Sequence, residues 1–393
     1  MAVLTKIGKE SLDNLVAEIS QNQKIPGFLF GATSVDEEIY LKPSGYNIVN
    51  DPKSGLIKED SMFWLCGQSK MVVHLAALQL VERGKITLEC PVSDYIPEFA
   101  NLVVLDDQMA DVPTYKPAKT IMRLKHILNF TSGLFYPMKG FRLDQQPEAY
   151  ATPYNKDNPI SQFLSIIKAI AHGWSSDIVG FLVEKVTGQS LENYLQDNIF
   201  KPLDIKASFY LTPDIKERLV DLTFRRGNNL EAWSDQSRII ERDPLKLACH
   251  MGGAGLYSSL KDFLTLLRHI LKIMAGTASN SIISPGTVES IFEPALNDQS
   301  TKPLDRFLSM DPFTPTSGTQ WTAGGFALSS SDLPGRRKKG SGFWFGWAHT
   351  FFLIDPTTEV ATVFGTQIMP AADQEVFKAV AELEKALYAG LAA

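Results

Sequence analysis

Apolar residues recur at helical spacing near the start of the chain and then gather into short runs. Within residues 11–22 the apolar positions share one face, and the segment ends before Pro26-Gly27, which predicts an amphipathic helix. Residues 27–34 and 37–46 are short runs rich in aromatic and β-branched side chains, with acidic residues between them. This pattern is typical of two strands joined as a hairpin.

The segment Gly67–Arg83 is apolar almost all the way round, and Gly84 follows it. A helix that is apolar on every face is a buried one, so we expect this segment in the interior. Residues 85–249 carry short helical patterns separated by long polar loops at 100–120 and 137–160. Long loops in a compact protein usually cover a binding site.

After residue 252 the pattern becomes regular again. It predicts a helix up to Met274 and a closing helix over 373–390. Between them, residues 321–330, 341–355 and 359–368 are apolar, aromatic runs that predict three adjacent antiparallel strands.

Strands at both ends of the chain with helices between them predict an α+β fold. The expected architecture is an antiparallel sheet built from both termini and flanked by helices, with an inserted helical lobe. We place the α/β lobe in residues 1–65 plus 250–393, the mainly helical lobe in residues 66–249, and the active cleft between the two.

Charge and composition exclude several classes of protein. The net charge of −6 argues against a nucleic-acid binder, because such proteins usually carry a basic face toward phosphate. The one basic cluster, Arg336–Lys339, is expected to be a solvated loop. The chain opens without a signal-peptide pattern and has no apolar run of about 20 residues, so we expect no membrane span.

Three cysteines, Cys66, Cys90 and Cys249, are odd in number and far apart. Their spacing argues against a disulfide framework and against a CxxC metal site, and it favours a reducing cytoplasm. The six histidines show no HExxH or similar spacing, so we expect no metal. His74, His126 and His269 lie in helical patterns and are expected to be structural. No cofactor motif is found, and nothing in the sequence sets the oligomeric state.

Five phrases of the sequence, in order, resemble the serine β-lactamase and penicillin-binding protein family. They are IPGFLFGA near the start, LKHILNFTSGL at 124–134, LVEKVTGQSLENYLQDNIFKPLDI at 182–205, GGAGLYSSLKDFLTLLRHIL at 252–271 and FFLIDP at 351–356. The branch that they resemble most is that of class C β-lactamase-related esterases and fungal polyketide acyltransferases, because HGWSSDIVG at 172–180 is similar to their Y-G-x-x-x-D-x-x-G spacing. The resemblance implies a β-lactamase/transpeptidase-like fold.

The resemblance also implies a catalytic S-x-x-K at the start of the buried helix, and here the sequence departs from it. Residues three apart on a helix share a face, so the family's serine can pass its proton to the lysine. In this chain the lysine is Lys70, but the serine position is Gly67. The family's catalytic tyrosine falls on His172.

Without a nucleophile, Lys70 and His172 form an acid/base pair. Burial and the positive end of the helix push a lysine toward its neutral form, and the ordinary pKa of histidine, about 6.5, suits proton transfer. The leading hypothesis is therefore an enzyme of small-molecule, secondary metabolism. It would catalyse isomerisation, elimination or cyclisation of a bulky hydrophobic substrate by Lys/His acid-base catalysis. Lys70 as a relic of the fold and His172 as a structural histidine are the alternatives.

Two further hypotheses stay open. Acyl transfer or ester hydrolysis can survive through Cys66, Ser69 or an activated water, although Ser69 is turned about 100° from Lys70 around the helix. S-x-x-K strings also begin at Ser165 and Ser258, but both lie in segments that match other family elements. The third hypothesis is a catalytically silent protein that binds a hydrophobic ligand.

The expected substrate-binding residues lie in segments that the family brings around its cleft. Gly67 opens space above Lys70, and His250 precedes a glycine-rich loop that borders the family's site. His349 lies near the strand that supplies the oxyanion N–H in the family, where Phe345 replaces a glycine. Aromatic strand residues are more often core than ligand contacts, but several together favour an apolar substrate. The full set is Gly67, Trp64, Trp174, His250, Trp344, Phe345, Trp347 and His349.

Overall fold

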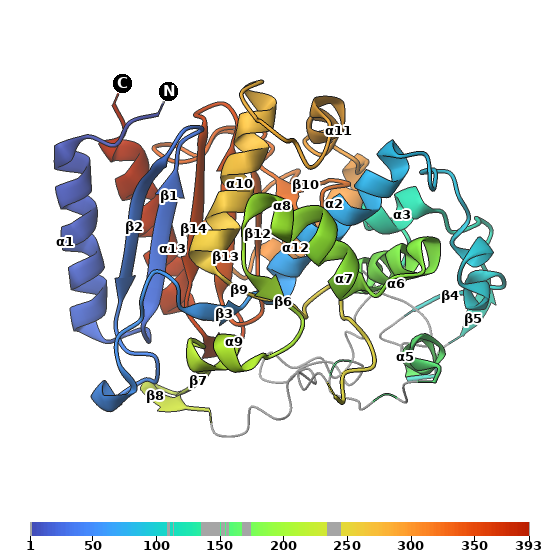
Figure 1. Ribbon diagram of the computed structural model, residues 1–393, viewed down its shortest axis with the longest axis horizontal. Coiled ribbons are helices and arrows are strands. Elements are labelled where there is room, and N and C mark those ends of the chain that lie inside the picture. Colours follow the sequence, from blue (N-terminus) through green and yellow to red (C-terminus); the bar gives the residue numbers. More distant parts are fainter. Residues whose placement is uncertain are drawn as a thin grey trace.

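The protein is described here by a computed structural model, in which an antiparallel sheet carries helices on both faces (Figure 1). The structure describes residues 2–107, 111–112, 114–134, 150, 154, 157–166, 174–233 and 245–392. His172, the predicted partner of Lys70, lies outside the described residues.

The main sheet has seven strands in the order β10-β11-β12-β13-β14-β1-β2, all paired antiparallel. Strand β1 pairs with β14, so the two ends of the chain join in the middle of one sheet, as the sequence predicts. The strands are β1 (Phe28–Thr33), β2 (Glu38–Ser44), β10 (Gln320–Trp321), β11 (Ala327–Leu328), β12 (Gly342–Phe345), β13 (Thr350–Asp355) and β14 (Val360–Gly365).

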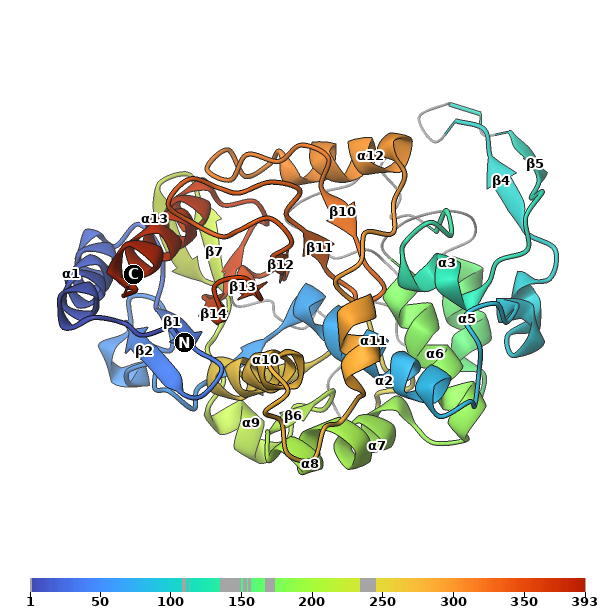
Figure 2. The ribbon, with the colours of Figure 1, turned by 90° about the horizontal axis from the view of Figure 1, so that it is seen from above.

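Successive residues of β1 are buried on opposite faces of the sheet, because neighbouring side chains of a strand point to opposite sides. Phe28 and Phe30 pack with helices α1 (Lys6–Asn22) and α13 (Gln374–Gly390), which lie side by side in Figures 1 and 2. Leu29 belongs to the larger core on the other face, under helix α10 (Leu260–Met274). The helix over residues 11–22 and the closing helix are thus confirmed.

Two of the predicted strand runs each turn back on themselves. Residues 341–355 form both β12 and β13, and the chain reverses at Gly346 and at His349, whose φ of 65° is left-handed. Residues 321–330 form β10 and β11 around Gly324-Gly325, where Gly325 has φ 77°. Our expectation of one strand per run was wrong, because continuous apolar patterning does not show a turn whose residues are buried.

Helix α2 (Ser69–Glu82) is buried at every position from Ser69 to Leu80, which confirms the predicted buried helix. It packs on α6 (Ser175–Thr187) and α7 (Leu191–Leu195). The other described helices are η1 (Pro52–Ser54), η2 (Cys66–Gln68), η3 (Val92–Asp94), η4 (Pro97–Phe99), α3 (Leu124–Leu128), α5 (Pro159–Ile166), η5 (Gln196–Phe200), α8 (Lys201–Leu203), α9 (Pro213–Glu217), α11 (Pro285–Ser290) and α12 (Asp298–Leu308).

Three small sheets accompany the main sheet, and two of them pair strands of residues 66–249 with strands from the rest of the chain. One has the order β3-β9-β6, from β3 (Met62–Trp64), β9 (Tyr257–Ser259) and β6 (Ala207–Ser208). Another has the order β15-β7-β8, from β15 (Ile368–Met369), β7 (Thr223–Arg226) and β8 (Asn229–Ala232). A hairpin of β4 (Val103–Leu105) and β5 (Tyr115–Pro117) projects far from α1 and α13 (Figure 2). The lobe boundaries at residues 66 and 249 stay a prediction.

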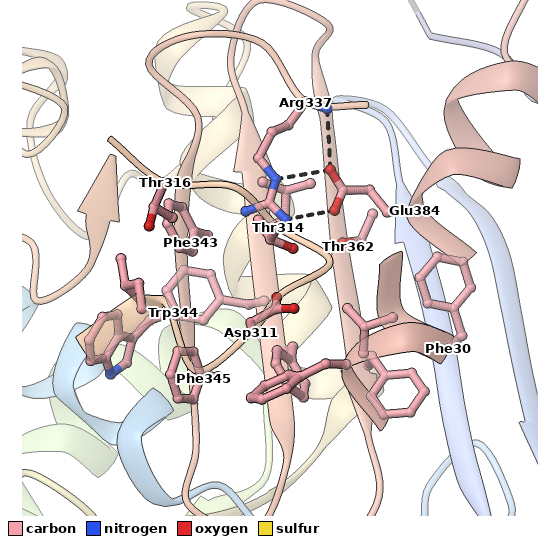
Figure 3. A pocket seen from close by; sticks show the side chains of 17 residues that line it. Phe30, Asp311, Thr314, Thr316, Arg337, Phe343, Trp344, Phe345, Thr362 and Glu384 are labelled. Atoms are coloured by element: carbon pink, nitrogen blue, oxygen red, sulfur yellow. Dashed lines mark hydrogen bonds and ion pairs between the residues drawn. The ribbon is translucent and has the colours of Figure 1, made fainter. Parts of the chain in front are cut away.

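The basic cluster Arg336–Lys339 is only half solvated, which corrects the sequence-based expectation. Lys338 and Lys339 are exposed, but Arg336 and Arg337 are buried and both pair with the buried carboxylate of Glu384 on α13. The side chain of Arg337 also lies over the ring of Phe343, 4.8 Å from its centroid (Figure 3). Burying two guanidinium groups is tolerable here because each finds a charge partner. Within the described ranges, no helix is both long and apolar enough to cross a membrane.

Candidate active site

The start of α2 is the centre of the site, and it has no room for a side chain at position 67. Cys66, at the beginning of the 3-10 turn η2, has a left-handed φ of 49°, a strained conformation for a residue with a Cβ atom. A Cβ atom added to Gly67 would lie closer than 3.0 Å to the carbonyl oxygen of Phe345 and 3.1 Å from Nε1 of Trp344. The glycine is therefore part of how α2 packs against β12.

Lys70 lies one turn further along α2, and its ammonium group is buried. Its Nζ donates to the carbonyl oxygen of Gly253 at 2.7 Å. Burial lowers the pKa of Lys70 to about 8, although the nearby carboxylate of Asp177 opposes part of this shift. The lysine is mostly charged at neutral pH, and the lowered pKa brings its free amine, a usable general base, closer to that pH.

Asp177, in the first turn of α6, is the acidic partner of Lys70. Its Oδ1 accepts from the backbone N–H of Gly253 at 2.9 Å, and its Oδ2 accepts from the hydroxyl of Tyr150 at 2.8 Å. The carboxylate is fully buried, and burial raises the pKa of Asp177 to about 6, against the opposing effects of the Gly253 N–H and Lys70. Lys70, Asp177 and Tyr150 thus meet around one glycine.

Asp177 and Tyr150 are site residues that were not predicted from the sequence. Asp177 is the aspartate of the HGWSSDIVG phrase, so the signal was present in the resemblance but was used only for alignment. Tyr150 belongs to a long polar stretch without periodicity, and no local pattern indicates that it reaches α6. His172 stands five residues before Asp177 in sequence, and its role stays a prediction because it lies outside the described residues.

The relocated nucleophiles considered from the sequence at the start of α2, Ser69 and Cys66, are both buried. The Ser69 hydroxyl accepts from the backbone N–H of Leu256 at 3.1 Å and is fully buried. The Cys66 thiol is fully buried, and burial raises the pKa of Cys66 far above its ordinary value, so the reactive thiolate is not formed near neutral pH. Ser258 and Lys261 have separate partners, Lys206 and Glu59, and Lys168 lies outside the described residues.

Three of the predicted aromatic residues border this site. Trp344 lies against Gly67, and its ring meets Trp321 edge to face at a centroid distance of 4.4 Å. Trp64 donates from Nε1 to the carbonyl oxygen of Ala254, the neighbour of Gly253. Trp174 contacts the ring of Tyr150 at 4.9 Å. The rings of Trp344, Trp64 and Trp174 come from segments that the sequence places at the cleft, whereas Trp321 and Tyr150 were not predicted there. Together they make the surroundings of the site apolar.

The remaining predicted residues are held elsewhere. The ring of Phe345 packs with Phe307 and Phe377 on the α13 side of the sheet, since side chains alternate along β12, and only its carbonyl faces Gly67. Both ring nitrogens of the buried His349 are bonded to backbone, Nδ1 to Ile368 and Nε2 to Asp373. Trp347 lies in the same turn as His349.

His250 lies three residues before Gly253, in a polar chain of its own. Its Nδ1 donates to the carboxylate of Glu184 at 2.8 Å, and its Nε2 lies 3.1 Å from the hydroxyl of Tyr210. Through the loop that follows it, His250 helps to fix the backbone that Lys70 and Asp177 share. A substrate contact of His250 stays a prediction.

A hollow on the α13 side of the sheet is not this site. Figure 3 shows its lining, with Phe343 and Phe345 along β12, Asp311 and Thr314 on the loop after α12, and the Arg337–Glu384 pair at one end. Lys70, Asp177 and Gly253 do not line it. Its cavity of about 50 Å³ has room for a few water molecules but not for a bulky substrate.

The charged groups of the candidate site suit proton transfer and do not suggest a metal. Among the described residues, no three histidine, cysteine, aspartate or glutamate side chains gather closely enough to hold a metal ion. What converges on Gly253 is one amine, one carboxylate and one phenol.

This fold, with a buried lysine at the start of a central helix facing an antiparallel sheet, defines the class of β-lactamase-like and penicillin-binding proteins. The chain belongs to the Beta-lactamase family, whose model matches residues 12–386.

Relatives of known name share most of their length with this chain. ML-236A carboxylate methylbutanoyltransferase of Penicillium citrinum is 24% identical over 93% of this chain and 91% of its own length. Lovastatin esterase of Penicillium rubens is 26% identical, covering 90% of this chain and 91% of its own. Unliganded simvastatin synthase from Aspergillus terreus shares the fold, with a TM-score of 0.81 and 24% identity over 97% of this chain and 98% of its own.

Proposed function

We propose that this protein transfers or hydrolyses an acyl group on a small, bulky, apolar molecule, with Lys70 as the general base that activates the accepting hydroxyl or water. The buried Lys70 amine carries the proposal, because its pKa, lowered to about 8, puts a free base within reach of neutral pH. Relatives named as an acyltransferase and an esterase support acyl chemistry over the isomerisation, elimination or cyclisation expected from the sequence.

The proton path follows from the contacts around Gly253. Neutral Lys70 accepts the proton of the alcohol or water as its oxygen attacks the acyl carbon, and the resulting ammonium is stabilised by the ionised carboxylate of Asp177. Tyr150 donates to Asp177 and keeps that carboxylate oriented. The acyl group does not pass through residue 67, since Gly67 offers no nucleophile.

Ester turnover by Lys70→Met tests the proposal. The wild-type protein and the variant are compared on a panel of p-nitrophenyl esters and acyl thioesters, with Lys261→Met as a matched control on an exposed lysine paired with Glu59. We expect kcat/KM to fall about 100-fold in Lys70→Met and to stay unchanged in Lys261→Met. Full activity of folded Lys70→Met would overturn the proposal.

A second candidate is the acid-base isomerisation, elimination or cyclisation that the sequence predicts. It is favoured by the steric exclusion of any side chain at position 67, which leaves only proton-transfer groups beside Lys70. Incubating the protein with apolar ketones in D2O would reveal it as deuterium uptake at carbon that Lys70→Met abolishes. Tight ligand binding without either kind of turnover would instead indicate a silent binding protein.

A further inference from the structure

A serine and a histidine outside the lysine cluster are arranged as a nucleophile and its base. Ser176 lies in the first turn of α6, and its Oγ is 2.8 Å from Nε2 of His74 on α2. The other ring nitrogen of His74, Nδ1, is 2.9 Å from the carbonyl oxygen of Ala323. No local pattern reveals this pair, because Ser176 and His74 are 102 residues apart.

The contact with Ala323 fixes the direction of both hydrogen bonds. A carbonyl oxygen can only accept, so Nδ1 carries the proton and Nε2 presents its lone pair. The hydroxyl of Ser176 therefore donates to Nε2, which is the arrangement that a serine nucleophile needs with its base. The carbonyl of Ala323 occupies the place of the carboxylate in a Ser-His-Asp triad.

The turn that carries Ala323 is held firmly against α2. A Cβ atom on Gly325 would lie 2.9 Å from the backbone carbon of Lys70 and 3.0 Å from Cγ of His74, so only glycine allows this approach. Thr322 ties the same turn together, accepting from the N–H of Gly324 and donating to the carbonyl of Phe326. The orientation of the imidazole is thus built into the β10–β11 turn.

We propose that Ser176 is the acyl-accepting nucleophile of this protein and that His74 is its general base, replacing the serine that position 67 cannot hold. The inference rests on the proposed acyl chemistry. Ser176 Oγ attacks the carbonyl carbon of an ester or thioester, and its proton passes to Nε2 of His74. The imidazolium then protonates the departing alkoxide or thiolate, and an ester bond links the acyl group to Ser176. In the second step Lys70 takes the proton of the acceptor hydroxyl or water as its oxygen attacks the acyl carbon. The bond from the acyl carbon to Ser176 Oγ then breaks, and Ser176 Oγ regains a proton from the Lys70 ammonium.

The surroundings of Ser176 favour developing negative charge. The N-terminal end of α6 directs its backbone dipoles toward this first turn, and a helix start stabilises an anion. Lys70 lies one turn before His74 on the same face of α2. Burial lowers the pKa of His74 to about 3, so the ring is neutral at physiological pH. Because desolvation is the main cause of that shift, uncovering the ring raises its basicity.

Phe130 covers the imidazole of His74. Its ring stacks on His74 at a centroid distance of 5.6 Å and also contacts Trp321 at 4.2 Å. Both Ser176 and His74 are fully buried beneath such contacts. The backbone of Phe130 has φ 58°, a left-handed conformation that is costly for any residue with a Cβ atom. Replacing Phe130 with alanine keeps this backbone cost and removes the ring that stacks on the imidazole.

Covalent labelling tests the inference. The protein is treated with a fluorophosphonate, and the adduct is measured by intact mass and located by peptide mapping. We expect one adduct per chain on Ser176 and no adduct in Ser176→Ala. Labelling should be unchanged in Ser175→Ala, because the hydroxyl of Ser175 contacts Ser132 instead of His74.

Variants of the base and its cover should change the labelling rate. His74→Asn keeps a donor for Ala323 but removes the base, so labelling should slow about 100-fold. Phe130→Ala should speed labelling. Thermal unfolding confirms that each variant is folded, and Ser176→Cys supplies a conservative nucleophile if Ser176→Ala does not fold.

The outcomes separate this inference from the proposed function. An adduct on another residue, or undiminished labelling of Ser176→Ala, overturns the assignment of Ser176. If ester turnover by Ser176→Ala equals that of the wild-type protein while Lys70→Met is inactive, the acyl function stands and the nucleophile is wrong. If Ser176 is labelled but no ester or thioester is turned over, the serine assignment stands and the proposed function falls.

Discussion

Lys70 and Asp177 hydrogen-bond to opposite sides of the same backbone residue, Gly253. The ammonium of Lys70 donates to the carbonyl oxygen of Gly253 at 2.7 Å, and the backbone N–H of Gly253 donates to the carboxylate of Asp177 at 2.9 Å. One peptide segment thereby fixes a buried base and a buried acid side by side. The pKa values of the two groups, about 8 and about 6, leave both charged at neutral pH.

The stability of the protein should depend on pH through Lys70. The pKa of Lys70 is about 8 in the folded protein and 10.5 ordinarily, so between these values the unfolded chain holds more protons. The free energy of unfolding should therefore increase as pH rises from about 8 to 10.5. This gain from Lys70 is fully present above pH 10.5 and is lost as pH falls through about 8. Urea titrations of wild type and Lys70→Met should diverge by roughly 3 kcal/mol across that window. If the free energies of unfolding of the two proteins change with pH in parallel, the pKa of Lys70 is not lowered by burial.

Replacing Asp177 with asparagine should shift the pH dependence of activity. The Asp177 charge raises the pKa of Lys70 against burial, so its removal lowers that pKa further. The inflection of kcat/KM that we expect near pH 8 should move to lower pH, measured as ester turnover from pH 5 to 10. Tyr150→Phe removes only the hydroxyl that bonds to Asp177, and it should shift the inflection less. If the pH profile of Asp177→Asn is identical with that of the wild type, the charge of Asp177 does not affect the pKa of the catalytic Lys70.

Placing a serine at position 67 should destabilise the protein. A side chain there meets the Phe345 carbonyl, so Gly67→Ser should lower the free energy of unfolding by about 1–3 kcal/mol and give no fluorophosphonate adduct on residue 67. Gly286→Ser is the matched control, because no atom lies within 4 Å of a Cβ there. A stable Gly67→Ser protein that is labelled at residue 67 would contradict this prediction, because it would show that the backbone of β12 moves away to make room for the side chain.

Glu384→Gln should be strongly destabilising. The carboxylate pairs with Arg336 at 2.7 Å and with Arg337 at 2.6 Å, and their charges hold the pKa of Glu384 at about 2 despite its burial. Removing the charge leaves two buried guanidinium groups without their ion-pair partner, at a cost of about 3–5 kcal/mol in urea titrations at pH 7. Because this pKa is depressed, the contribution of Glu384 should persist above about pH 4.5 and fade as pH falls toward 2. Glu382→Gln, an exposed neighbour paired with Lys378, should change stability little.

The sequence by itself determined the family, an antiparallel sheet that joins strands from both ends of the chain, and the buried helix α2 with Gly67 and Lys70 at its start. These features follow from periodic burial and from short motifs, which are local properties of the chain. The tertiary structure alone decided that Asp177 and Tyr150 surround Gly253, that Ser176 meets His74, and that Arg336 and Arg337 are buried. Each of these depends on side chains far apart in sequence, whose distances and desolvation arise only when the sheet, α2 and α6 pack together.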